Sequence, residues 1–136
     1  MTSRTLVLLD SIGHVGDQHA GEVIVSGSHG GTSAADYILR LAQAPYAALF
    51  NDAGRGKDNA GLAGLPLLQA RGVIAATYSH LSGRIGDAAD GLANGVITEL
   101  NELALQAGLR TGWTVAQAVA RMTATTSSQP EANTGR

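Results

Sequence analysis

The sequence predicts a small layered α/β fold, with a mostly parallel sheet of about four strands, helices on both faces and one antiparallel edge strand. Short apolar runs alternate with helical patterns through the middle of the chain, an order typical of parallel sheets. Residues 23–25 are apolar at consecutive positions, as expected for a strand covered on both faces. The 136 residues are 44% hydrophobic and 15% charged, which indicates a folded chain.

The first two predicted strands are residues 6–9 and 23–25. Residues 10–22 between them are polar, contain glycine and show no helical period. A parallel crossover normally contains a helix and more chain, so a hairpin is favoured, with the first strand antiparallel. If the connection is instead a parallel crossover, Asp10 and Ser11 join the edge of the sheet at which the later loops meet.

The first helix is expected to begin at Ser33, with Asp36 as its capping-box partner, and to stop before Pro45. Residues 46–50 form the third predicted strand. This order of strand, loop and helix then repeats along the chain.

The second helix is expected to hold Pro66 in its first turn and to end at Gly72, followed by a strand at 73–77. A longer helix is predicted over 92–107, because apolar residues there recur every three or four positions. Gly108 suits the position just past its end.

A last helix is predicted to start at Thr114, with Gln117 completing a capping box, and to end near Met122. Residues 1–122 are therefore expected to form a single α/β domain. Residues 123–136 carry no apolar face and are expected to form a disordered tail.

Composition argues against several classes of protein. The net charge is −2 and aromatic residues are 4%, which disfavours nucleic acid as a partner. The absence of cysteine excludes disulfides, thiolate nucleophiles and cysteine-based zinc sites. No apolar run approaches the roughly 20 residues of a membrane helix, and the first nine residues lack the features of a signal peptide. We therefore expect a cytoplasmic protein.

Loops that follow parallel strands gather at one edge of the sheet, where ligands bind. Here these loops are residues 26–33, 51–61 and 78–90, and they are dense in titratable groups. The predicted catalytic residues are His29, Asp52 and His80, and the predicted substrate-binding residues are Ser28, Gly30, Gly31, Asn51, Lys57, Ser79 and Arg84.

The first loop, Ser-Gly-Ser-His-Gly-Gly, precedes a helix N-terminus, which attracts anions through its N–H groups. His29 adds a group that titrates near neutral pH; the alternative is a structural histidine bonded to its own loop. The segment departs from the G-x-S-x-G nucleophile elbow because serine stands at the first glycine position. Ser28 is therefore expected to bind a ligand or cap the loop rather than act as a nucleophile.

The second loop, Asn-Asp-Ala-Gly-Arg-Gly-Lys-Asp, lacks the spacing and the Ser or Thr of a phosphate-binding Walker loop. Asp52 directly follows a buried strand, where burial would raise its pKa toward a useful range. Lys57 is expected to hold a substrate anion or to act as a base. The alternatives are an Asp52 that caps the loop and a solvated Lys57.

The third loop contains His80, Arg84 and Asp87. Arg84 suits a bidentate contact with a substrate carboxylate, and the alternative pairs it with Asp87 or with a carboxylate of a neighbouring loop. His29, His80 and Asp52 together would suit a metal ion, but no spacing motif requires one, so no metal is predicted.

These features predict an enzyme, a hydrolase or lyase without a redox cofactor, that acts on a small carboxylate-bearing metabolite by His/Asp acid–base chemistry. The alternative is a non-catalytic regulatory subunit that binds a phosphate or nucleotide. A chain this small buries a modest share of its surface and has sheet edges to protect, which favours a homo-oligomer.

Overall fold

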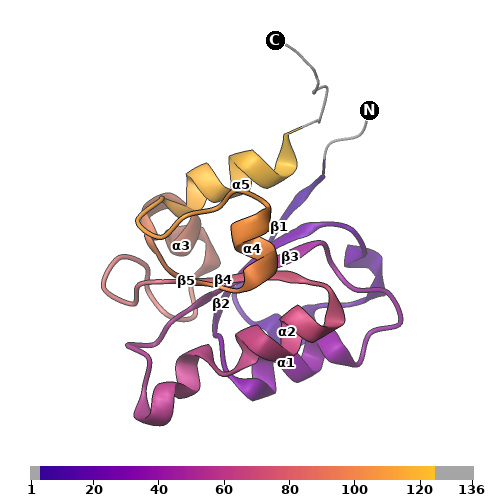
Figure 1. The fold of residues 1–136 in the computed structure, drawn as a ribbon, viewed down its shortest axis with the longest axis horizontal. Coiled ribbons are helices and arrows are strands. Elements are labelled where there is room, and N and C mark those ends of the chain that lie inside the picture. The colour runs from indigo at the N-terminus through magenta and orange to yellow at the C-terminus, as the bar shows by residue number, and fades with distance from the viewer. Residues whose placement is uncertain (1–3, 125–136) are drawn as a thin grey trace.

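A computed structural model describes residues 4–124 and shows a mixed sheet of five strands with helices, as the α/β prediction required (Figure 1). The strands lie in the order in which they occur along the chain. The first four run parallel, and the last is antiparallel to its neighbour. The strands are β1 (Leu6–Leu9), β2 (Val23–His29), β3 (Ala47–Asn51), β4 (Ile74–Tyr78) and β5 (Ile97–Leu100).

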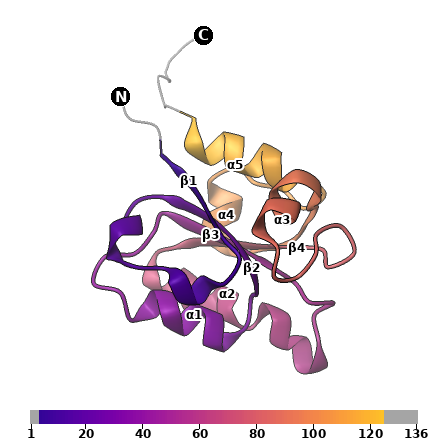
Figure 2. The same ribbon diagram turned by 180° about the vertical axis from the view of Figure 1, so that it is seen from behind.

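Helices cover both faces of this sheet (Figures 1 and 2). Because β2, β3 and β4 follow one another across the sheet, right-handed crossovers place both connecting helices on one face. The remaining three helices cover the other face. The helices are α1 (Thr32–Leu39), α2 (Gly64–Arg71), α3 (Ala88–Asn94), α4 (Glu102–Gln106) and α5 (Val115–Thr123), with short 3₁₀ turns η1 (Ile12–His14), η2 (Asp17–His19) and η3 (Lys57–Leu62).

The three central strands are buried on both faces, which explains their consecutive apolar residues. Ile24, Ala48 and Phe50 face α1 and α2, whereas Val25 and Leu49 face α3, α4 and α5. None of the helices formed by residues 4–124 is long and apolar enough to cross a membrane.

The prediction of an antiparallel first strand is wrong, because β1 pairs with β2 in parallel. The connection at residues 10–22 crosses over through the turns η1 and η2 instead of an α-helix. A 3₁₀ turn rises about 2.0 Å per residue against about 1.5 Å in an α-helix, so a short segment can return along a short strand. Ile12, which is 2% exposed, packs this connection against the face of the sheet that α1 covers.

The predicted helix over 92–107 is also wrong, because the segment divides into α3, β5 and α4. Gly95 leaves the helical conformation, and Asn101 caps α4 by accepting a hydrogen bond from the N–H of Ala104. Ile97 and Thr98 between them are β-branched and suit a strand. The apolar residues recur at helical spacing because all three elements face the same core cluster. The antiparallel edge strand is therefore β5.

Other boundaries agree more closely with the sequence. Gly72 and Gly108 adopt left-handed φ values of 86° and 98°, and Thr114 forms the predicted capping box with Gln117. Ser33 is not the cap of α1, because the chain enters the helix directly from the extended Gly31.

The predicted tail lies outside the described residues, apart from its first two. Thr123 is the last residue of α5, and Ala124 follows as the C-cap.

Tyr78 anchors the end of β4, directly before the third loop. Its ring is fully buried, and its hydroxyl donates to the Ser26 carbonyl oxygen at 2.7 Å. A Cβ on Gly83 or Gly91 would lie 2.8 and 2.7 Å from ring carbons of Tyr78, so both glycines permit this packing. Burial raises the pKa of Tyr78 to about 12, which keeps the phenol protonated.

Candidate functional site

The residues that end the three central strands occupy neighbouring positions at one edge of the sheet. His29 at the end of β2 is opposite Asn51 of β3, and Asn51 is opposite Tyr78 of β4. Adjacent strands lie about 4.8 Å apart, so the backbones of His29 and Tyr78 are separated by about 10 Å. Asp52 and Ser79 follow directly, as the parallel arrangement predicts.

Asn51 joins the second loop to the third. Its side-chain amide donates to the Gly83 carbonyl oxygen at 2.8 Å, and its side-chain oxygen accepts from the N–H of Ala53 at 2.8 Å. The side chain is fully buried. Asn51 therefore supports the loops from within instead of facing a ligand.

The first strand also contributes to this edge, as the parallel alternative required. The Asp10 carboxylate accepts a hydrogen bond from the N–H of Ala88 at 2.9 Å. The N–H of Gly86 donates to the Gly27 carbonyl oxygen at 2.7 Å. The third loop is thus tied to both β1 and β2.

Asp52 is the most constrained polar side chain of the site. It is 5% exposed, yet both carboxylate oxygens are hydrogen-bonded. Oδ1 accepts from the backbone N–H groups of Gly54 at 2.8 Å and His80 at 3.0 Å, and Oδ2 accepts from the Thr98 hydroxyl at 3.1 Å. The donors come from three different segments of the chain.

These donors decide the protonation state of Asp52. Burial alone raises the pKa of the carboxyl group, as the sequence led us to expect. The hydrogen bonds from Gly54, His80 and Thr98 outweigh burial, and the net pKa lies below the ordinary value of 3.8. The expected rise in pKa is therefore wrong, and Asp52 is an ionised carboxylate at neutral pH.

His80 lies against this carboxylate. Its Nδ1 is 3.4 Å from Asp52 Oδ1, and its side chain is 46% exposed. A carboxylate at Nδ1 favours the proton on that nitrogen, which leaves Nε2 as the acceptor of a neutral imidazole. Gly54 lies beside the ring, since a Cβ there would be 3.2 Å from Cε1.

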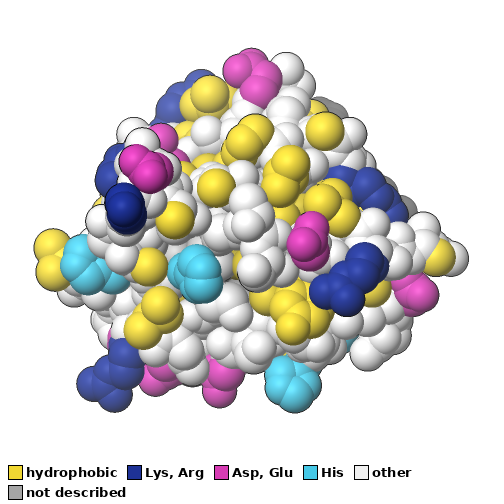
Figure 3. Space-filling view, turned by 90° about the horizontal axis from the view of Figure 1, so that it is seen from below, with side chains coloured by type: hydrophobic (Ala, Val, Ile, Leu, Met, Phe, Trp, Pro, Cys, Tyr) yellow, Lys and Arg dark blue, Asp and Glu magenta, His cyan; other side chains and the backbone are white. Residues whose placement is uncertain are grey.

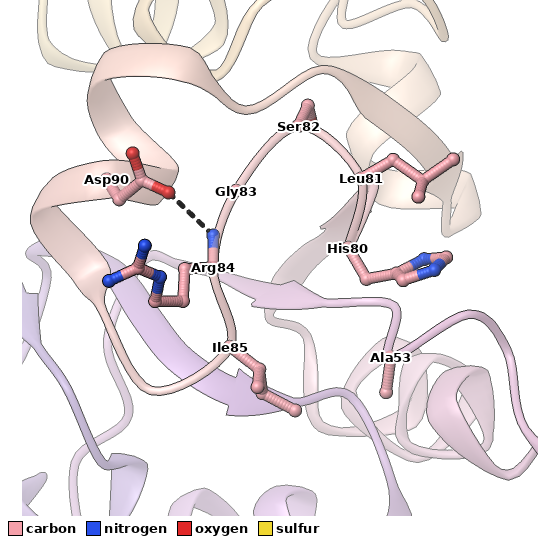
Figure 4. Close-up of a pocket in the computed structure, with 8 residues that line it drawn as sticks. All are labelled: Ala53, His80, Leu81, Ser82, Gly83, Arg84, Ile85 and Asp90. Atoms are coloured by element: carbon pink, nitrogen blue, oxygen red, sulfur yellow. Dashed lines mark hydrogen bonds between the residues drawn. The ribbon is translucent and has the colours of Figure 1, made fainter.

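A pocket of about 540 Å³ opens beside His80 (Figure 4). In Figure 4 His80 and Leu81 point to one side of the third loop, while Arg84 lies on the other side, near Asp90. The lining residues are Ala53, His80, Leu81, Ser82, Gly83, Arg84, Ile85 and Asp90.

Arg84 is an exposed cation in this pocket. The ion pairs within 4.0 Å among residues 4–124 are Arg55–Glu99 and His80–Asp52, so the guanidinium of Arg84 has no carboxylate at that distance. The alternative pairing with Asp87 is therefore absent. Asp87 instead caps α3 by accepting from the N–H of Asp90, whose carboxylate accepts from the backbone N–H of Arg84 at 2.7 Å.

Several predicted site residues have structural contacts instead. Ser28 Oγ accepts from the N–H of Ile12 at 3.0 Å, and Ser79 Oγ accepts from the N–H of Leu81 at 3.0 Å. The N–H of Gly30 donates to the Asn51 carbonyl oxygen at 3.1 Å and is not available to an anion.

Three more predicted residues lie outside the pocket. A Cβ on Gly31 would be 2.9 Å from Cδ2 of His29, so the imidazole of His29 lies over that glycine. Lys57 is exposed at the start of η3. His29 and Lys57 are not among the residues that line the pocket.

The contribution of β5 to the site escaped the sequence analysis. Thr98 bonds Asp52, and its hydroxyl also lies 2.9 Å from that of Thr77. Glu99 forms an ion pair with Arg55 of the second loop. A threonine and a glutamate beside β-branched Ile97 were the available signal, but the helical spacing of the neighbouring apolar residues concealed it.

The second loop holds an unusual backbone conformation. Ala53, Arg55, Asp58 and Asn59 have φ values of 52°, 72°, 55° and 58°. Left-handed conformations of residues other than glycine cost on the order of 1 kcal/mol each and concentrate at functional sites. The Asp52 hydrogen bonds and the Arg55–Glu99 pair help to hold this loop.

Metal-ligating side chains do not cluster here. Within the described part of the chain, no three His, Asp or Glu side chains lie close enough together to hold a metal ion.

Replacing Thr98 with valine is expected to destabilise the protein by about 1–3 kcal/mol, because valine removes a hydrogen bond to a charged, buried carboxylate. Thr98→Ser retains the hydroxyl and is the matched control. Urea denaturation of both variants measures the difference. Equal stabilities of the two variants would contradict the role of the hydroxyl.

The contribution of Asp52 to stability is expected to be lost only at acidic pH. The pKa of Asp52 is lower in the folded chain than its ordinary value of 3.8. Its contribution to the free energy of unfolding is therefore complete above pH 3.8 and is lost as the pH falls through the folded pKa. The stability difference between wild type and Asp52→Asn should shrink as the pH falls below 3.8. Urea denaturation at several pH values below 3.8 measures it, and a difference that grows as the pH falls through this range would contradict the assignment.

Comparisons with models of known protein families, with curated proteins and with solved structures found no match to this chain.

Proposed function

We propose that the protein is a small cytoplasmic enzyme that acts on a carboxylate-bearing metabolite by hydrolysis or elimination. The observation that carries this proposal is the contact between ionised Asp52 and His80 at the margin of a pocket that also contains Arg84. A carboxylate next to an imidazole, in a pocket whose lining also includes an arginine, is an arrangement suited to general acid–base chemistry.

In the proposed mechanism His80 carries the proton and Asp52 does not. Asp52 remains ionised, lies 3.4 Å from Nδ1 of His80 and stabilises the imidazolium that forms when Nε2 takes up a proton. This revises the role of Asp52 from a proton acceptor to a positioning carboxylate. Arg84 binds the carboxylate of the substrate.

Two reactions fit these roles. In hydrolysis, Nε2 of His80 takes a proton from water as the water oxygen bonds to the carbonyl carbon, and the imidazolium then returns the proton to the departing oxygen or nitrogen. In elimination, Nε2 takes a proton from the carbon beside a carbonyl or carboxylate, and the leaving group departs from the next carbon as the double bond forms.

Homo-oligomer formation is part of the proposal. On its outer side β1 has no strand partner within residues 4–124, and its residues carry no charge. Leu8 on this strand is 42% exposed. Exposed uncharged edges tend to pair with another chain. Light scattering at micromolar concentration is expected to give at least the mass of a dimer, and a monomer would contradict it.

The enzymatic proposal is tested with a panel of carboxylate-bearing esters, amides, lactones and hydroxy acids, followed by ¹H NMR. At least one class is expected to be converted by the wild type but not by His80→Asn. His14→Asn changes an exposed histidine of η1 and should keep the activity. If no compound is converted in a His80-dependent manner, the proposal fails. Binding of phosphate or a nucleotide without turnover would favour a regulatory subunit.

The charge of the surface bears on the choice of partner. On the face drawn in Figure 3, basic side chains are dispersed among acidic and apolar ones. A nucleic-acid backbone needs a continuous basic surface, so this face favours small anions over polyanions.

A further inference from the structure

We infer that the pocket beside His80 binds a monocarboxylate carried on an aliphatic body, in preference to a phosphorylated or polyhydroxylated molecule. This inference rests on the proposed function, because it names the substrate class of the same site. Three properties of the pocket lining support it: its apolar side chains, its charge balance and its lack of free hydroxyl partners.

The apolar side chains are unusually exposed. Leu81 is 86% exposed and Ile85 is 52% exposed, and both line the pocket together with Ala53. Single exposed apolar side chains are common, but here two large ones line one pocket beside the proposed acid–base residue. An aliphatic ligand would remove their surface from water, which is favourable in proportion to the area covered.

The charge balance favours a monoanion. Arg84 contributes one positive charge, and Asp90 contributes one negative charge to the same lining. Hydrogen bonds from the N–H of Arg84 and the side chain of Asn94 lower the pKa of Asp90, so it is ionised at neutral pH. The single charge of a carboxylate matches the one guanidinium of the lining, whereas the second charge of a phosphate dianion would meet no further lysine or arginine there.

The lining offers no free hydroxyl group to a sugar or polyol. Ser82 is the hydroxyl residue among the lining side chains. Its Oγ donates to the Ser79 carbonyl oxygen at 2.9 Å and accepts from the N–H of Val96 at 2.9 Å. The hydroxyl is thus committed to the protein and cannot replace a hydrogen bond that a polyhydroxylated ligand loses from water.

The size of the pocket sets the scale of the ligand. A volume of about 540 Å³ lies within the roughly 300–1,000 Å³ of small-molecule sites. It admits a carboxylate with a chain of several carbons.

The test is binding of acetate, butyrate, hexanoate and inorganic phosphate to the full chain, measured as Kd by ¹⁵N NMR titration. Hexanoate is expected to bind more tightly than acetate, by about two- to fourfold for each added methylene. Phosphate is expected to bind more weakly than hexanoate. Arg84→Gln should weaken the binding of every acid by roughly tenfold or more, because it removes a charge-assisted contact.

Matched variants separate the contribution of the apolar side chains to ligand affinity from that of Arg84. The double variant Leu81→Ala/Ile85→Ala is expected to abolish the gain with chain length while leaving acetate binding unchanged. Leu105→Ala changes a leucine of α4 that is 42% exposed and lies outside the pocket lining, and it should behave as wild type. An affinity independent of chain length, tighter binding of phosphate, or a gain with chain length that persists in the double variant would overturn the inference.

The outcome is separable from that of the proposed function. Chain-length-dependent binding without turnover of any panel compound would leave the inference standing and remove the enzymatic proposal. Turnover of substrates without preference for an aliphatic body would leave the enzymatic proposal standing and overturn the inference.

Discussion

Asp52→Asn is expected to lower turnover of the compound found with the carboxylate panel by 10²- to 10⁴-fold. The amide oxygen can still accept from the N–H groups of Gly54 and His80, and the Thr98 hydroxyl can turn to accept from the amide nitrogen. The geometry therefore survives, but the negative charge beside Nδ1 of His80 is lost. The imidazolium formed during the reaction is then no longer stabilised, and the barrier rises.

Steady-state kinetics of the wild type and of Asp52→Asn measure this effect. Asp36→Asn is the matched control, because Asp36 is an exposed carboxylate of α1. Circular dichroism establishes that each variant is folded before rates are compared. Turnover of Asp52→Asn within threefold of wild type would show that the carboxylate does not support the imidazole.

Gly61→Ala is expected to lower the free energy of unfolding by about 3 kcal/mol or more. Gly61 is buried, and its N–H donates to the Arg55 carbonyl oxygen at 2.8 Å. A Cβ there would overlap the backbone carbonyl of Asp52. A flexible side chain can move aside from such an overlap, but a backbone carbonyl cannot move without disturbing the loop, so the effect exceeds that of ordinary overpacking.

Urea denaturation measures this loss, with Gly72→Ala as the control. Gly72 ends α2 at a φ of 86° with open space around it, so alanine there costs only the left-handed strain of about 1 kcal/mol. The two substitutions add the same methyl group and differ in what it meets. Equal losses in the two variants would contradict the close packing of Gly61 against Asp52.

The proximity of Asp52 and His80 could be predicted from the sequence. Asp52 follows a buried apolar run and His80 follows the next one, and parallel strands bring their carboxyl ends together. Their contact required only that β3 and β4 be neighbours. Sequence spacing did not show whether Arg84 pairs with Asp87, because that depends on the directions of the side chains within one loop.

The environment of Asp52 was not predictable in the same way. Burial raises its pKa, and hydrogen bonds from a local donor, Gly54, and from two distant ones, His80 and Thr98, lower it further than burial raises it. Thr98 reaches Asp52 only because its segment forms β5, and the apolar spacing of that segment resembled a helix. An apolar run in the sequence indicates that the residue after it is buried. The sequence does not indicate which hydrogen-bond donors other strands bring to that residue.

The order of the strands also bears on how the chain folds. Each strand of this sheet pairs with the strand nearest to it along the chain, so every pairing closes a short loop. Short loops lose little entropy on closure and favour rapid folding. A sheet of this kind can grow strand by strand from either end. β5 is the last strand along the chain and its one strand partner is β4, so the hydroxyl that completes the hydrogen bonding of Asp52 is supplied only when the final pairing of the sheet forms.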